Sequence, residues 1–98
     1  MLTKQQIKTS SIPILKKNGV TKAALFGSFV RGDATDTSDI DFLIEFENGK
    51  SLFDLVGLQL ELKELLHRNV DVLTYNSVHH RLLESILNEQ EVFYEKIS

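Results

Sequence analysis

The chain has 98 residues, a formal net charge of −3, 42% hydrophobic residues and no cysteine. This length predicts one domain over residues 1–98, and the absence of cysteine excludes disulfides, thiolate metal sites and a cysteine nucleophile. No apolar run approaches the ~18 residues of a membrane span, and an acidic chain is a poor candidate for binding nucleic acid directly. We therefore expect a cytoplasmic protein that contacts neither a membrane nor nucleic acid.

The first predicted element is a helix that begins with the capping box of residues 3–6 and ends at residues 18–19. Pro13 predicts either a kink or a restart capped by Ser10 or Ser11. A short strand over residues 20–26 follows.

Residues 28–32 are expected to form one or two helical turns before a polar loop over residues 33–38. The next strand, residues 39–46, alternates apolar and polar side chains. This alternation places Asp39 and Asp41 on the same face. Two neighbouring carboxylates repel each other unless a cation lies between them, and their hard oxygen ligands suit Mg²⁺ or Mn²⁺.

A second long helix, residues 52–68, is predicted to begin at a cap formed by Ser51 and Asp54. Its apolar stripe is expected to face the core, although part of it could meet another chain. The stripe consists of Leu52, Leu55, Val56, Leu58, Leu62, Leu65 and Leu66.

A third strand, residues 70–74, places Asp71 on the same face as Leu73. Asp41 and Leu43 have the same relation in the preceding strand, so pairing of the two strands would bring Asp71 beside the acid pair as a third ligand. A last helix is expected from Ser77 through residue 87. Residues 92–94 are expected to form a short strand or an extended tail.

The motif that links these elements is Gly27-Ser28, ten residues, then Asp39-x-Asp41, with Arg31 between its two halves. A Gly-Ser turn lets the backbone approach a phosphate closely and adds a hydroxyl donor. The whole pattern resembles that of the DNA polymerase β-like nucleotidyltransferase superfamily. Val30 departs from it, because the family commonly has a smaller residue there.

The resemblance extends over most of the chain to the minimal nucleotidyltransferases (MNT), which are often antitoxins paired with a HEPN-domain ribonuclease toxin. It implies an α/β (α+β) fold in which helices flank a small mixed β-sheet. It also implies catalytic and metal-binding roles, with two Mg²⁺ (or Mn²⁺) ions, for Asp39, Asp41 and Asp71. Nucleotide-binding roles are implied for Gly27, Ser28 and Arg31.

The implied reaction transfers a nucleoside monophosphate onto a hydroxyl group. The donor is ATP, which gives AMP, or another nucleoside triphosphate. The analogy suggests a tyrosine of a cognate HEPN toxin as the acceptor, and a hetero-oligomer of the two proteins. Alternatively, a protein with the same fold could act as a non-catalytic antitoxin that neutralises its partner by occlusion.

Two other patterns carry less weight. Asp36-Thr37-Ser38 is similar to the active-site sequence of dimeric aspartic proteases, but no apolar strand precedes it and no glycine follows Gly57. His79 and His80 are adjacent on a predicted helix, where side chains diverge by about 100°, so a surface pair is expected rather than a metal site. His67 is expected to complement the dipole of its helix.

Overall fold

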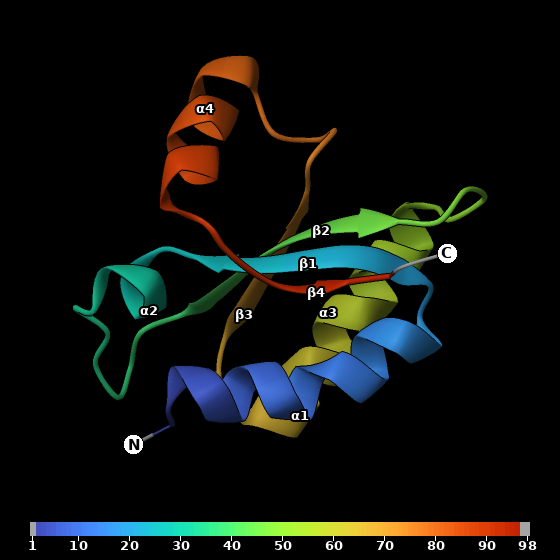
Figure 1. Ribbon diagram of the computed structural model, residues 1–98. Coiled ribbons are helices and arrows are strands. Elements are labelled where there is room, and N and C mark those ends of the chain that lie inside the picture. Colours follow the sequence, from blue (N-terminus) through green and yellow to red (C-terminus); the bar gives the residue numbers. More distant parts are fainter. Residues whose placement is uncertain (1, 97–98) are drawn as a thin grey trace.

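The computed structural model describes residues 2–96 of the chain (Figure 1). None of the helices in this range is long and apolar enough to span a membrane. The elements, in chain order, are α1 (Lys4–Lys17), β1 (Val20–Phe26), α2 (Ser28–Arg31), β2 (Ile40–Phe46), α3 (Leu52–Leu66), β3 (Val70–Thr74), α4 (His80–Glu89) and β4 (Glu91–Glu95).

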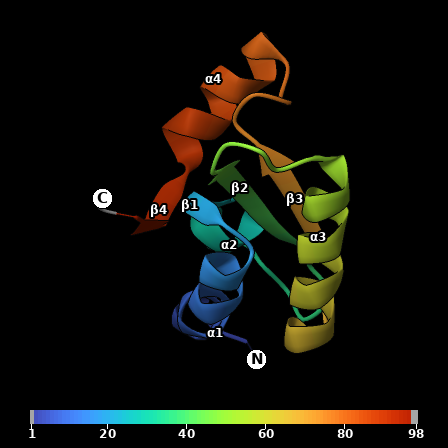
Figure 2. The same cartoon turned by 90° about the vertical axis from the view of Figure 1, so that its right-hand side faces the viewer.

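The strands form a mixed sheet in the order β3-β2-β1-β4. β2 and β3 are parallel, whereas β1 is antiparallel to both β2 and β4. Both views place α1 and α3 on one face of the sheet and α4 on the other (Figures 1 and 2). This arrangement confirms the predicted α/β architecture, and it resolves residues 92–94 as part of an edge strand.

The two faces of the sheet are packed unequally. The larger apolar cluster lies between the sheet and the pair α1 and α3, and it includes the fully buried Ile7, Leu25, Phe42 and Leu58. The smaller cluster on the α4 side has three buried residues among those the structure describes, Ala24 and Leu43 of the sheet and Ile86 of α4. Since successive strand residues alternate faces, the acids that follow the parity of Leu43 lie on the α4 face.

Helix α1 begins as predicted. The Thr3 hydroxyl accepts the Gln6 N–H (3.1 Å), and the Gln6 side chain accepts the Thr3 N–H (2.8 Å). Of the two alternatives predicted at Pro13, the restart is wrong, because α1 continues without interruption to Lys17. Ser11 is buried inside this helix and satisfies its hydroxyl by donating to the Ile7 carbonyl (2.6 Å).

For the later helices, one prediction is wrong and another is only partly confirmed. Helix α4 begins at His80 rather than Ser77, because Ser77 closes a turn with Thr74 and His79 accepts the Arg81 N–H through Nδ1 (3.3 Å). The stripe on α3 is only partly core: Leu58, Leu62 and Leu66 are buried, whereas Leu52, Val56 and Leu65 are exposed.

Candidate functional site

The register of the sheet brings two of the predicted acids together. In the parallel pair of β2 and β3, Asp41 lies opposite Asp71, and on its other side Asp41 pairs with Phe26 at the end of β1. Adjacent strands lie about 4.8 Å apart, so side chains on one face at such a pair are neighbours. The placement of Asp71 beside Asp41, predicted from strand parity, is confirmed.

Asp39 lies just outside the sheet, since β2 begins at Ile40 rather than at residue 39 as predicted. Its side chain is exposed, as is that of Asp71, whereas Asp41 is half-buried between them. The three acids therefore differ in environment, with Asp41 the most deeply placed.

Burial, first, and then the negative charges of Asp71 and Asp39 raise the pKa of the Asp41 carboxyl from 3.8 to about 6. Arg31 opposes this shift and Glu89 adds to it. A carboxylate held among other acids in this way is poised to accept a cation.

Asp41→Asn is therefore expected to stabilise the protein at pH 7 when no divalent cation is present. The unfolded chain loses this proton near pH 4 and the folded chain near pH 6, so the folded state loses stability as the pH rises between those values. The cost is nearly complete one pH unit above the folded-state pKa, at about pH 7. Each tenfold difference in proton affinity is worth about 1.4 kcal/mol, and solvent screening at a half-buried group reduces the total to roughly 1–2 kcal/mol.

Urea unfolding in the presence of EDTA at pH 4.5 and pH 7 measures this effect. The stability of the wild type should fall relative to that of Asp41→Asn as the pH rises. Parallel pH profiles for the two proteins would show that Asp41 titrates normally.

The Gly27-Ser28 turn follows β1 directly and lies against Asp41. Gly27 has φ 79° and ψ −151°, a conformation open almost only to glycine. A Cβ atom there would overlap Asp41 Oδ2 and lie 3.3 Å from its Cγ. The predicted helical turns are confirmed as the four-residue helix α2, which ends at Gly32, and Val30 is accommodated by partial burial against the larger cluster.

One backbone donor of this turn is already engaged. The Gly27 N–H donates to Glu89 Oε1 at the end of α4 (2.6 Å). Within residues 2–96, the N–H groups of Ser28 and Phe29 and the Ser28 hydroxyl have no hydrogen-bond partner. The hydrogen-bond donors of this turn that are free for a phosphate therefore begin at Ser28 rather than at Gly27.

Arg31 also contacts Glu89, with its Nη1 atom 3.2 Å from Oε1 and 3.3 Å from Oε2, and its Nε atom lies 3.4 Å from Asp33 Oδ2. These carboxylates, Glu89 first, raise the pKa of the guanidinium. Glu89 was missed by sequence reasoning, because it lies 62 positions from Gly27 at the end of an amphipathic helix with no local motif.

Residues 9–98 match the family model described as "Polymerase beta, Nucleotidyltransferase". The chain belongs to this nucleotidyltransferase family. A relative from Methanocaldococcus jannaschii named "putative protein adenylyltransferase MJ0435" is 57% identical over 84 residues, which cover 86% of this chain and 90% of the relative.

Solved structures agree with this membership. One described as a "putative minimal nucleotidyltransferase" is 32% identical, with a TM-score of 0.79 and a match that covers 89% of each chain. A chain in the complex of a tri-AMPylated Shewanella oneidensis HEPN toxin with its MNT antitoxin shares the fold at 19% identity (TM-score 0.75, 94% of this chain and 72% of that one). The predicted identity as a minimal nucleotidyltransferase is confirmed.

The acids around Asp41 offer carboxylate oxygens as donor atoms for a metal. As their side chains stand, no three His, Asp or Glu residues between positions 2 and 96 are grouped closely enough to hold one ion. Asp39 and Asp71 are exposed and can rotate toward Asp41, whose proton affinity they already raise. Carboxylate oxygens are the ligands that Mg²⁺ takes, so this set fits the metal.

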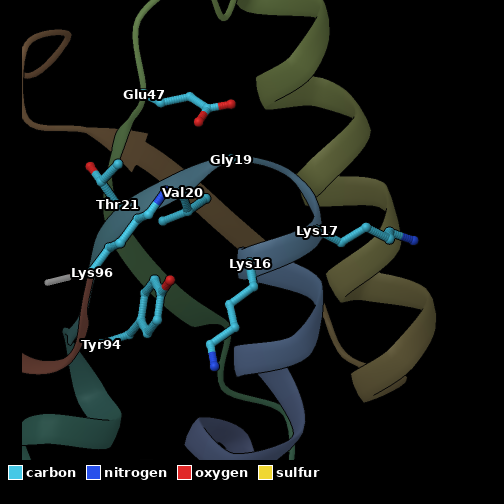
Figure 3. Close-up of a pocket in the computed structure, with 8 residues that line it drawn as sticks. All are labelled: Lys16, Lys17, Gly19, Val20, Thr21, Glu47, Tyr94 and Lys96. Carbon is cyan, nitrogen blue, oxygen red and sulfur yellow. The ribbon is translucent and has the colours of Figure 1, made fainter. Parts of the chain in front are cut away.

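A separate hollow of about 380 Å³ lies at the opposite end of the sheet, where β1 begins and β4 ends (Figure 3). Lys16, Lys17 and Lys96 are among the residues that line it. Lys17 points toward α3, where its Nζ atom lies 2.7 Å from Glu61 Oε2. The carbonyl groups at the C-terminal end of α1 also weaken the attraction of the hollow for anions. The candidate functional site of the nucleotidyltransferase is therefore the group of acids at Asp41, not this hollow.

Proposed function

We propose that this nucleotidyltransferase transfers AMP from ATP, in a reaction that depends on Mg²⁺, onto a hydroxyl group of a protein partner. The observation that carries the proposal is the register that places Asp41 between Asp71 on β3 and the end of β1. Carboxylates for a cation and donors for a triphosphate thereby meet at one end of the sheet. The choice of AMP over other nucleotides is supported by the name of the relative from M. jannaschii.

Each residue at this end has a proposed role. Asp39, Asp41 and Asp71 would hold two Mg²⁺ ions (Mn²⁺ would also fit), which when bound would neutralise phosphate oxygens and activate the attacking hydroxyl. Ser28 donates its hydroxyl and N–H to the β- and γ-phosphates. Gly27 keeps the space beside Asp41 clear of a Cβ atom.

The transfer itself is an in-line substitution at phosphorus. The acceptor oxygen bonds to the α-phosphorus as the bond to the pyrophosphate oxygen breaks, and Asp71 takes the hydroxyl proton. Arg31, half-exposed, turns from Glu89 toward the pyrophosphate and offsets its developing charge.

The acceptor is proposed to be a tyrosine of a cognate HEPN toxin, so that the chain acts as an antitoxin. The acids lie at an open end of the sheet with Asp39 and Asp71 exposed, so a partner must present its hydroxyl group to them. The fold shared with a chain of the AMPylated HEPN toxin–antitoxin complex supports this choice.

Mass spectrometry of the HEPN partner after incubation with this chain, ATP and Mg²⁺ tests the proposal. Tyrosine carrying one or more AMP groups, absent when EDTA is added, is the expected result. An unmodified partner that is nevertheless inhibited, equally by Asp39→Asn, would instead establish neutralisation by occlusion.

The apolar side chains exposed on α3 are a candidate surface for the proposed hetero-oligomer. Leu52, Phe53, Val56 and Leu60 are between 52% and 89% exposed, so they contribute little to folding. Phe53→Ser is expected to leave the free energy of unfolding within about 0.5 kcal/mol of wild type and to weaken the complex about tenfold or more. Urea unfolding and titration with the partner measure the two effects, and unchanged affinity would place the interface elsewhere.

A further inference from the structure

We propose that Arg68 is a positioning residue that holds Asp39 in place for the metal, an inference that rests on the proposed function. Arg68 lies between α3 and β3, three residues before Asp71, and its side chain is partly buried. Its guanidinium donates to the carbonyl oxygens of Thr35 (3.0 Å) and Ser38. Both carbonyls belong to the loop that leads into Asp39.

The bond to Ser38 acts directly on Asp39. The Ser38 carbonyl and the Asp39 N–H belong to one planar peptide group, so anchoring that carbonyl fixes the plane from which Asp39 departs. On the other side of Asp39, the Ile40 N–H donates to the Asn69 carbonyl (3.0 Å). Residues 68 and 69 therefore hold both peptide groups that flank Asp39, which is itself outside the sheet.

Arg68 also contacts the turn that would receive the phosphates. Its Cζ atom lies 5.6 Å from the centroid of the Phe29 ring, within the range of a cation–π contact. Phe29 is buried and follows Ser28 directly. The guanidinium donates to both carbonyls through Nη2 while its plane can lie on the ring, whereas an ammonium group has no plane to stack on a ring. One side chain thus joins the Asp39 loop and the Ser28 turn at the start of the strand that carries Asp71.

Arg68→Gln is expected to reduce the affinity for Mn²⁺, measured by calorimetry with a non-hydrolysable ATP analogue, by about tenfold or more, as is usual when a ligand loses its supporting partner. Arg68→Lys keeps the positive charge, but its shorter side chain lacks the planar group that lies on Phe29 while Nη2 reaches both carbonyls, so its affinity should resemble that of Arg68→Gln. Lys63→Gln, which removes an exposed cation near the end of α3, five residues before Arg68, is the matched control. It should bind as wild type does.

Amide hydrogen exchange without metal separates positioning from a general loss of structure. In Arg68→Gln the amides of residues 37–40 should exchange faster, while those of β1 and β4 keep their wild-type rates. Unchanged Mn²⁺ affinity, full recovery in Arg68→Lys, or faster exchange throughout β1 and β4 would each overturn the proposal. If the wild type itself fails to bind Mn²⁺ with the analogue, the proposed function fails, and the exchange rates still decide whether Arg68 anchors Asp39.

Discussion

Asp39→Asn is expected to fold normally and to lose nucleotide transfer by about a thousandfold or more, because metal binding supplies several kcal/mol of transition-state stabilisation. Asp39 is exposed and lies outside the sheet, so its loss removes no packing. The amide side chain keeps the shape of the carboxylate and loses the charge. Transfer of label from ATP to the proposed HEPN partner, together with a thermal unfolding curve, measures both parts of the prediction.

Asp36→Asn is the matched control for this experiment. Asp36 is also an exposed acid of the loop between α2 and β2, but it lies four residues before β2, whereas Asp39 lies directly before it. Its variant should transfer nucleotide at the wild-type rate. Undiminished transfer by Asp39→Asn, in a preparation free of wild-type protein, would remove Asp39 from the mechanism.

Gly27→Ala is expected to lose both stability and ATP binding. Alanine is strained at φ 79°, at a cost of about 1–3 kcal/mol. In addition, its Cβ would overlap Asp41 Oδ2, so either the turn or the carboxylate must move. Urea unfolding measures the first effect and calorimetric titration with ATP and Mg²⁺ measures the second.

Gly57→Ala provides the opposite control. Gly57 lies inside α3 with nothing within 4 Å of the position its Cβ would occupy, so alanine should stabilise the helix by about 0.5–1 kcal/mol. A Gly27→Ala protein that is as stable as wild type and binds ATP equally well would show that the close contact with Asp41 has no function.

Local patterns predicted much of this structure. The strands over residues 20–26 and 70–74 have the expected bounds, since their apolar runs are bounded by turn residues. Parity along the strands was enough to place Asp71 beside Asp41, because a sheet preserves face and register over its whole width.

Contacts between distant segments were beyond such patterns. Glu89 accepts from the Gly27 N–H and pairs with Arg31, and Arg68 donates to the Ser38 carbonyl 30 positions away. Within its own segment, each of these charged side chains is an ordinary surface charge. The leucines of α3 were overassigned to the core for a related reason. A helical stripe wider than the contact it makes leaves residues such as Val56 exposed, and only the packing shows where the contact ends.

A crystal structure with Mn²⁺ and a non-hydrolysable ATP analogue tests the central claim most directly, because the anomalous scattering of manganese locates the ion independently of the protein. The expected result is manganese bound by Asp39 and Asp41 with Asp71 beside it, and a triphosphate over Ser28. Manganese absent from these acids, or the analogue bound instead in the lysine-lined hollow at the far end of the sheet, would contradict it.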